Sequence, residues 1–325
     1  MFDDVFSFFD RHGSFVLTTH DSPDADGFGS QMIMSSILKK SGKEVRVINA
    51  DPFPNYLKFL DGLPVEIWDE EKHSPVLEDS ALLILDTCEE YHIGSIRKAL
   101  KKVKEVFVFD HHEPGPRSKL SGLIDSAAAS TCEMAIELAL RMDVPLDEKT
   151  ATAAYAGIVF DSGFFAYPKT TLRTFNAAIR TIEWGAQPNF IYRKLMENSS
   201  YSAILLQKQA LSHLQFHIGK KLAVMTLSSE DMKETGAEFE EADNIVNIPL
   251  KAKEVEVSVL IKEKNPEEIR CSLRSKGNVN VSKIAQGFGG GGHVTAAGFR
   301  TSLSIEKILN KLLADMEARL YGEQV

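Results

Sequence analysis

SFVLTTHDSPDADGFGS, at residues 14–30, is the stretch that decides the fold of the first half of the chain. Its apolar run Ser14–Thr19 predicts a buried β-strand, and a helix is expected to begin near Gly27. Three further apolar runs predict buried strands at Glu44–Asn49, Ala81–Leu85 and Glu105–Phe109, with helical stretches between them. Buried strands that alternate with helices are typical of a parallel α/β sheet.

The remainder of the chain predicts a helical segment followed by a second α/β unit. Helices are expected between about Asp125 and Met196, including Glu148–Val159 and Thr170–Glu183. The elements expected after them are a long helix at Ala203–His217, strands at Leu222–Leu227, Glu254–Lys262 and Glu268–Arg274, and a final helix at Ile305–Leu320. The sequence therefore predicts an α/β protein of two domains, with a parallel sheet in 1–199 and a smaller α/β domain in 200–325, joined by a helical linker.

Composition limits the class of protein. The 325 residues are 43% hydrophobic and 26% charged, as in soluble globular proteins. The acidic start MFDDVFSFFD has no basic leader region, and no apolar run approaches the roughly 18 residues of a membrane span, so we expect a cytoplasmic protein with no membrane partner. Cys88, Cys132 and Cys271 are far apart and form no CxxC pair, so we expect reduced thiols.

The net charge limits the partners. A value of −9 argues against a protein that coats long nucleic acid, because such binding requires many cations along the backbone phosphates. Small anionic substrates are compatible with this charge if divalent cations bind locally, since each ion adds two positive charges at its site. A two-fold homodimer stays open, as the commonest assembly of soluble oligomers.

Acidic and histidine side chains follow the predicted strands where each strand ends. They are His20, Asp24 and Asp26 after the first strand, Asp86 after Ala81–Leu85, and Asp110, His111 and His112 after Glu105–Phe109, while Asp161 closes a later apolar run. The carboxyl ends of parallel strands meet at one edge of the sheet, so we expect these side chains to gather there. Each segment alone has a plainer explanation, because aspartates are good helix caps and a histidine pair is often structural. Together they predict a metal site.

The ligand types indicate which ions would bind. Carboxylate oxygens with some imidazole nitrogens suit Mn²⁺ or Mg²⁺ better than zinc. Asp24 and Asp26 diverge along the chain and can serve adjacent ions. We therefore expect two divalent ions, with Mn²⁺ favoured over Mg²⁺ because of the histidines.

A glycine run near the C-terminus predicts a phosphate-binding loop. Gly289, Gly290, Gly291 and Gly292 let main-chain N–H groups approach an anion without interference from a Cβ atom. His293 and Arg274 would add polar or charged donors. Such a run on its own is equally consistent with a flexible loop.

The acidic segments resemble the four ordered motifs of the DHH phosphoesterases. The residues that carry this resemblance are His20, Asp24, Asp26, Asp86, Asp110, His111, His112 and Asp161. Gly289–His293, followed by Ala296, Ala297 and Gly298, resembles the signature of the DHH-associated C-terminal domain. The two resemblances cover nearly the whole chain and imply metal-dependent hydrolysis of phosphate esters.

The resemblance also implies a role for each residue. One ion would be held by His20, Asp24 and Asp86, and the other by Asp26, Asp86, His111 and Asp161, so that Asp86 bridges the pair. Asp110 would orient a histidine, and His112 would donate a hydrogen bond to a phosphate oxygen or the leaving group. Arg274, the Gly289–Gly292 backbone and His293 would hold the rest of the substrate in a cleft between the domains.

Family members of this two-domain size degrade oligoribonucleotides of a few residues and dephosphorylate adenosine 3′,5′-bisphosphate, and some relatives cleave linear or cyclic di-adenylate. Two alternatives stay open. One is a manganese inorganic pyrophosphatase or exopolyphosphatase, and the other is a catalytically inactive regulator that binds nucleotides. An inactive regulator would typically have lost metal ligands, whereas all the expected positions are occupied here.

Overall fold

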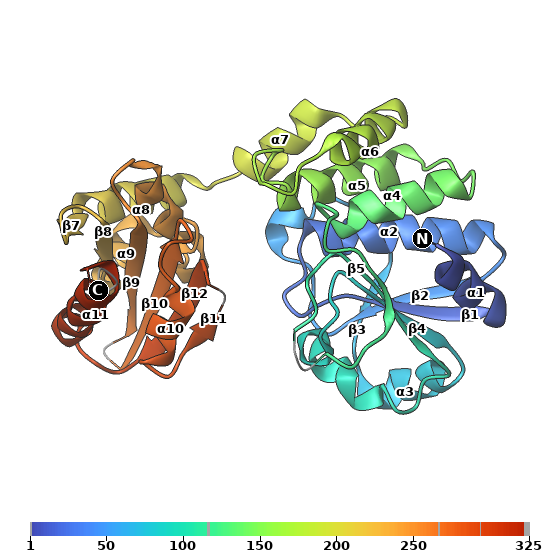
Figure 1. The fold of residues 1–325 in the computed structure, drawn as a ribbon, viewed down its shortest axis with the longest axis horizontal. Helices are drawn as coiled ribbons and strands as arrows, with labels where there is room; N and C mark the ends of the chain where they lie inside the picture. Colours follow the sequence, from blue (N-terminus) through green and yellow to red (C-terminus); the bar gives the residue numbers. More distant parts are fainter. Residues whose placement is uncertain (1, 116–117, 266, 293, 322–325) are drawn as a thin grey trace. The chain divides into compact units, whose positions relative to one another are not determined.

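The computed structural model describes residues 2–115, 118–265, 267–292 and 294–321 (Figure 1). The chain divides into two compact units, Met1–Asn198 and Ser199–Val325. Each unit contains its own six-stranded sheet and its own hydrophobic cores. Within the described residues, no helix has both the length and the apolar character needed to cross a bilayer.

The first unit is built on a parallel sheet with the strand order β3-β2-β1-β4-β5-β6. Its strands are β1 (Ser14–Thr18), β2 (Glu44–Asn49), β3 (Val65–Ile67), β4 (Ala81–Leu85), β5 (Val106–Asp110) and β6 (Gly122–Ile124). Its helices are α1 (Asp3–Arg11), α2 (Ala25–Lys40), α3 (Glu70–Glu78), α4 (Thr131–Arg141), α5 (Glu148–Asp161), α6 (Leu172–Glu183) and α7 (Pro188–Met196), with 3₁₀ turns η1 (Asn55–Leu57) and η2 (Glu90–Ala99). The predicted parallel α/β domain is confirmed.

Both faces of this sheet are covered. Successive residues of β1 enter different cores, since Phe15 and Leu17 pack on one side and Val16 on the other. In Figure 1, α2 lies against one face with α4, α5 and α6 beyond it, and α3 lies on the opposite side. Because both faces are buried, the central strand β4 is apolar throughout, which explains why the run ALLIL shows no alternation.

The strand order reverses between β1 and β4. From β1 the chain builds outward through β2 and β3, and it then returns to place β4, β5 and β6 on the other side of β1. The loops that leave β1 and β4 therefore diverge at the carboxyl ends of these two strands, which is where open parallel sheets place their ligands. The segments after Thr18 and Leu85 begin at this point.

The second unit contains a mixed sheet with the order β11-β12-β10-β9-β8-β7, in which β8 and β9 pair in parallel and the other neighbouring strands pair antiparallel. Its strands are β7 (Gln215–His217), β8 (Leu222–Leu227), β9 (Val257–Asn265), β10 (Glu268–Ser275), β11 (Gly291–Gly292) and β12 (Ala296–Thr301). Its helices are α8 (Tyr201–Ser212), α9 (Ser229–Thr235), α10 (Val281–Gln286) and α11 (Ile305–Tyr321), with 3₁₀ turns η3 (Phe239–Ala242) and η4 (Ile245–Lys251). The predicted second α/β unit is confirmed.

One predicted helix is wrong at its C-terminal end. The helix expected at Ala203–His217 stops at Ser212, and Gln215–His217 instead form the edge strand β7, antiparallel to β8. The turn that follows has positive φ angles at residues 218–220, which allows the chain to reverse within a few residues. Pairing with the sheet edge therefore overrides the helical preference of this segment.

Candidate metal centre

The predicted metal ligands converge at the carboxyl edge of the first sheet. Single ligand atoms lie within 4.8 Å of one another in three groups, which are His20, Asp24 and Asp86; Asp26, Asp86, His111 and Asp161; and Asp86, Asp110, His111 and His112. The first two groups have the same members as the two ligand sets that the family resemblance implied. All eight predicted side chains are thus brought together, and Asp86 belongs to every group.

Asp86 occupies the centre of this cluster. It follows β4 with a φ of 63°, a left-handed conformation that aspartate tolerates better than most residues. Its side chain is almost fully buried, with Oδ2 lying 3.6 Å from Nε2 of His20 and Oδ1 lying 3.6 Å from Nε2 of His111. The two carboxylate oxygens therefore face different histidines, as a ligand shared by two ions requires.

His20 and Asp24 approach Asp86 from the loop between β1 and α2. Nδ1 of His20 lies 2.7 Å from a main-chain carbonyl, which can only accept, so Nδ1 carries the hydrogen and Nε2 faces the carboxylates. Asp24 is the N-cap of α2 and accepts two main-chain N–H bonds at Oδ1. The capping explanation of Asp24 is therefore correct but incomplete, because the same oxygen lies 3.7 Å from Nε2 of His20.

His111 is the histidine of the second group. Its Nε2 lies 2.9 Å from Oδ2 of Asp161, the last residue of α5, and 3.9 Å from Oδ2 of Asp26. Its Nδ1 lies 3.4 Å from the main-chain oxygen of Ala128. As at His20, the contact with a carbonyl directs Nε2 toward the carboxylates.

The start of α4 fixes the buried carboxylate of Asp26. The main-chain N–H of Thr131 donates to Oδ2 at 2.6 Å, and that of Cys132 donates to Oδ1 at 2.9 Å. The hydroxyl of Thr131 also donates to Oδ1 of Asp86 at 3.0 Å. Sequence reasoning missed these supporting groups. The capping-box pattern STCE at 130–133 was the available signal, because it marks a helix start with free N–H groups.

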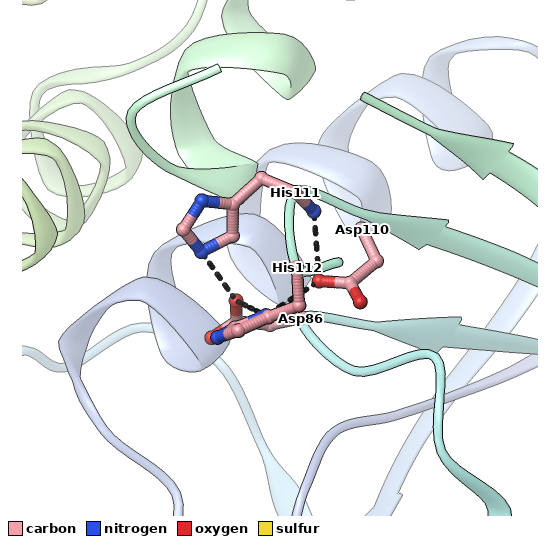
Figure 2. Close-up of side chains that lie close together, drawn as sticks. All are labelled: Asp86, Asp110, His111 and His112. Atoms are coloured by element: carbon pink, nitrogen blue, oxygen red, sulfur yellow. Dashed lines mark hydrogen bonds and ion pairs between the residues drawn. The ribbon is translucent and has the colours of Figure 1, made fainter. Parts of the chain in front are cut away.

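Asp110 and His112 form a separate pair beside Asp86 (Figure 2). Oδ1 of Asp110 accepts hydrogen bonds from the main-chain N–H of His111 at 2.7 Å and from Nδ1 of His112 at 2.8 Å. The side chain of His112 is 54% exposed. Since Asp110 engages Nδ1, the nitrogen that His112 can offer to a substrate is Nε2.

The cluster shifts the pKa values of its members. Burial raises the pKa of Asp86 well above its usual range, and the charge of Asp26 raises it further. Burial and the same neighbour raise the pKa of Asp161 to about 6. Burial opposes the charged form of both histidines, but the neighbouring carboxylates, Asp24 and Asp86 for His20 and Asp161 for His111, outweigh it and raise the pKa to about 11 for His20 and about 10 for His111. Protons on the two imidazoles thus offset part of the carboxylate charge.

The side chains present fit divalent metal ions. Nε2 of His111 is buried and makes no hydrogen bond of acceptable geometry within the described part of the chain. Each group supplies one imidazole nitrogen and several carboxylate oxygens, a donor set suited to hard or borderline ions. The nearby thiol of Cys88 stays protonated, because burial raises its pKa to about 12.

Metal binding is expected to release protons. His20 and His111, with pKa values of about 11 and 10, are protonated at neutral pH and must lose these protons to bind a metal ion through Nε2. We expect about two protons released per pair of ions, and Mn²⁺ affinity that rises about tenfold per pH unit for each displaced proton. Below pH 6, where Asp161 also becomes protonated, the dependence should steepen.

Calorimetric titration with Mn²⁺ at neutral pH checks this prediction. The measured binding heat should change between buffers of different ionisation enthalpy in proportion to the protons released. An identical heat in all buffers would show that the two imidazoles are already neutral and would contradict the prediction.

The glycine run of the second unit has two different explanations along its length. Gly290 and Gly292 are required by packing, because a Cβ atom would lie 2.2 Å and 2.5 Å, respectively, from main-chain oxygens of β12 or its start. Gly289 has a φ of 80°, which favours glycine. At Gly291 a Cβ atom would meet no atom of the described residues within 4 Å, and φ is not in the left-handed region. The described part of the fold therefore does not explain the glycine at 291.

Arg274 lies on the same sheet as this run. It sits on β10, which pairs with β12, and β12 pairs with β11. Its Nη1 donates to the main-chain oxygen of Leu273 at 3.0 Å, and burial lowers its pKa. His293, the remaining predicted substrate residue, lies outside the described residues.

Comparison with known proteins identifies both units. The model of the DHH family N-terminal domain matches residues 14–158, and the model of the DHHA1 domain matches residues 219–321. The chain is 31% identical over 292 residues to the bifunctional oligoribonuclease and PAP phosphatase NrnA of Thermus thermophilus, an alignment that covers 88% of this chain and 83% of that protein.

Two further proteins are similar over most of this chain. The cyclic-di-AMP phosphodiesterase GdpP of Bacillus subtilis is 25% identical over 313 residues, which cover 91% of this chain and 46% of that protein. The crystal structure of an exopolyphosphatase-related protein from Bacteroides fragilis superposes with a TM-score of 0.89 and 25% identity, covering 99% of this chain and 97% of that one. From its matched domains and its relatives, this chain belongs to the DHH family of phosphoesterases and carries a C-terminal DHHA1 domain.

Proposed function

We propose that this enzyme uses two divalent ions, Mn²⁺ or alternatively Mg²⁺, to hydrolyse short oligoribonucleotides and adenosine 3′,5′-bisphosphate to mononucleotides. The observation that carries the proposal is the pair of ligand groups that share Asp86 at the reversal point of the sheet. His20 and Asp24 complete one group, and Asp26, His111 and Asp161 complete the other. Two such ions, when bound, activate water and neutralise the charge that develops at phosphorus.

The chain's own groups orient the ligands and move a proton. The start of α4 holds the carboxylates of Asp26 and Asp86 in place through three hydrogen bonds. Asp110 holds His112 by Nδ1, and the hydrogen bond from His112 outweighs burial and keeps the pKa of Asp110 low. His112 then protonates the departing oxygen from Nε2.

The net charge of the chain and its similarity to known enzymes both favour a small nucleotide as substrate. A net charge of −9 disfavours the binding of a long polymer, which requires many cations along its phosphates, whereas two or three phosphate contacts suffice for a very short one. The relatives named above act on oligoribonucleotides, on PAP or on cyclic di-AMP. A linear or cyclic di-adenylate is therefore a further candidate substrate.

A second candidate function is hydrolysis of pyrophosphate or polyphosphate. The observation that favours it is the fold likeness to the exopolyphosphatase-related protein at a TM-score of 0.89. The same metal centre serves either substrate class, so the substrate contacts of the second unit must decide between them.

Parallel assays distinguish these functions. Product release is measured from adenosine 3′,5′-bisphosphate, a di-adenylate, pyrophosphate and polyphosphate, each with and without Mn²⁺. Manganese-dependent release of AMP supports the nucleotide enzyme, and cleavage of pyrophosphate or polyphosphate alone supports the second candidate. Nucleotide binding without hydrolysis of any of the four would favour an inactive regulator.

Replacement of His112 tests its role as proton donor. We expect His112→Gln to lower kcat by about 10²–10⁴-fold for adenosine 3′,5′-bisphosphate, because the departing hydroxyl needs a proton. The loss should be much smaller for the p-nitrophenyl ester of a nucleotide, whose leaving group departs unprotonated. Equal losses on both substrates would indicate that His112 only binds phosphate.

Replacement of Gly291 tests the binding of the substrate phosphate without disturbing the fold. An alanine at 291 fits the part of the fold that the structure describes, since its Cβ atom would lie within 4 Å of no atom there. We expect Gly291→Ala to leave the thermal unfolding temperature unchanged but to raise KM about tenfold for nucleotides, because the added methyl group obstructs the approach of a phosphate to the main chain. Gly13→Ala, also in open space, serves as the control. An unchanged KM would remove this loop from the substrate site.

A further inference from the structure

The turn that follows α5 contains three consecutive residues with positive φ angles. They are Gly163, Phe164 and Phe165, at 56°, 53° and 67°. Glycine adopts this left-handed region freely, whereas bulky side chains rarely do. The turn begins two residues after Asp161, which belongs to the metal centre. Strained backbone of this kind is typical of functional sites, where it positions particular side chains.

Aromatic packing holds the strained turn in one conformation. The ring of Phe165 stacks on Phe175 at a centroid distance of 4.9 Å, and the ring of Phe164 meets Tyr192 edge-on at 5.4 Å. The hydroxyl of Ser162 accepts a hydrogen bond from the main-chain N–H of Phe165 at 3.1 Å. These contacts offset the conformational cost, so the turn is formed before any ligand binds.

The strained turn brings Tyr167 back over the end of α5. The main-chain N–H of Tyr167 donates to the main-chain oxygen of Ser162 at 2.9 Å. A Cβ atom at Gly163 would lie 2.6 Å from two ring atoms of Tyr167, so the ring packs directly on this glycine. Tyr167 nevertheless remains 59% exposed. An exposed aromatic ring that rests on the main chain can serve as a stacking platform for a nucleobase.

Lys169 leaves the same turn and contacts the metal centre. Its Nζ donates to the main-chain oxygen of His111 at 3.4 Å. An ammonium group has three hydrogens, and Lys169 makes no ion pair with a carboxylate of the described residues. No other Lys or Arg side chain in the described part of the first unit donates to a residue of this centre. Lys169 can therefore bind an anionic ligand that enters the centre.

Tyr167 and Lys169 are spaced for a single nucleotide. The main-chain N–H of Thr170 donates to the main-chain oxygen of Tyr167 at 3.0 Å, which closes a β-turn with Pro168 at its second position. Proline fixes its own φ, so this turn is stiff. The Cα atoms of Tyr167 and Lys169 are at most about 7 Å apart, because one residue separates them. In a nucleotide one ribose separates the base from the phosphate, so one ligand can reach both side chains.

We propose that Tyr167 and Lys169 form a nucleotide subsite beside His111 and Asp161. Lys169 binds a non-bridging phosphate oxygen, and the base of the same nucleotide stacks on Tyr167. This inference rests on the proposed function and names the part of the substrate that the first unit recognises. Pyrophosphate and polyphosphate contain no base, so they can use Lys169 but not Tyr167. The subsite therefore favours nucleotides over the second candidate substrate class.

Isothermal titration calorimetry of the full chain with Mn²⁺ present tests the base contact. The two ligands are AMP, which is the product of the proposed reaction, and ribose 5-phosphate, which lacks the base. AMP should bind the unmodified protein at least about tenfold more tightly, because only AMP can stack on the tyrosine. Tyr167→Ala should weaken AMP binding about tenfold and leave the binding of ribose 5-phosphate unchanged. The matched control is Tyr201→Ala, at a tyrosine of α8 that is 78% exposed.

The same titrations with Lys169→Gln test the phosphate contact. Glutamine can still donate a hydrogen bond to the carbonyl of His111 but carries no charge, so both ligands should bind about tenfold more weakly. Lys169→Arg retains the charge and should restore most of the affinity. The matched control is Lys149→Gln, which removes an exposed lysine at the other end of α5. Thermal unfolding temperatures of all variants should stay near that of the unmodified protein.

Three results would overturn the proposal. Equal affinity of the unmodified protein for AMP and ribose 5-phosphate would exclude a base contact. Unchanged binding of both ligands in Lys169→Gln would exclude the phosphate contact. Weaker binding of ribose 5-phosphate in Tyr167→Ala would show that this tyrosine supports the turn and does not recognise the base. These measurements require no turnover, so a failure of the proposed hydrolysis in the parallel assays remains a separate result.

Discussion

Replacement of Asp86 by asparagine is expected to lower kcat/KM at least about 10³-fold, because the shared carboxylate is lost from both ligand groups at once. Asparagine keeps the shape of the side chain and tolerates the φ of 63° at this position. It also retains an oxygen that can accept the hydrogen bond from Thr131. The variant should therefore fold while losing high-affinity Mn²⁺ binding, which a calorimetric titration measures.

Measurements of thermal stability distinguish a specific loss of Mn²⁺ binding from misfolding of the variant. The pKa of Asp86 is raised in the folded protein, so the ionised carboxylate costs stability at every pH above its usual range. Removing that charge should leave the unfolding temperature without Mn²⁺ equal or higher, while the increase on adding Mn²⁺ disappears. Wild-type Mn²⁺ affinity in Asp86→Asn would show that Asp86 is not a shared ligand.

Gly157→Ala is expected to disturb the metal centre, although Gly157 is not one of the predicted ligands. A Cβ atom at 157 would lie 2.5 Å from Sγ of Cys132 and 2.9 Å from both Cα and Oδ1 of Asp26. Such overpacking typically costs about 1–3 kcal/mol of stability. Displacement of Asp26 should also weaken Mn²⁺ binding about 10–100-fold, as expected when the groups that support a ligand are disturbed.

A second variant separates the two effects of Gly157→Ala. Adding Cys132→Ala removes the sulfur atom that makes the closest contact, but it leaves the contacts with Asp26. The double variant should recover part of the unfolding temperature in thermal denaturation, with Mn²⁺ affinity still low. Gly13→Ala provides the control for a glycine replaced in open space. Unchanged Mn²⁺ affinity in Gly157→Ala would contradict the inferred packing against Asp26.

The central strands and the clustering of the acidic and histidine side chains were predictable because each leaves a mark in the sequence. The run ALLIL is followed directly by Asp86, and the run that ends at Phe109 is followed by Asp110 and two histidines. The side chains that can bind a metal therefore stand where the strands end. Parallel topology then brings these ends together whatever the details of the loops. The grouping of the ligands therefore follows from a few residues and one rule of sheet geometry.

The groups that support the ligands were not predictable in the same way. The carboxylate of Asp26 is held by main-chain N–H groups of residues 131 and 132, which every amino acid except proline possesses. The need for glycine at 157 depends on how closely α5 approaches Asp26 and Cys132, which no local pattern encodes. The short strand β7 was missed because its pairing with β8 depends on tertiary context.

The close packing of five aspartates and three histidines affects how stable the protein is in a cell. Carboxylates packed at this density repel one another and resist burial, so their cation is also a folding ligand that stabilises the native chain by mass action. When manganese is scarce, we expect a larger unfolded fraction and faster proteolysis. Metal supply would then set the abundance of the enzyme as well as its turnover rate.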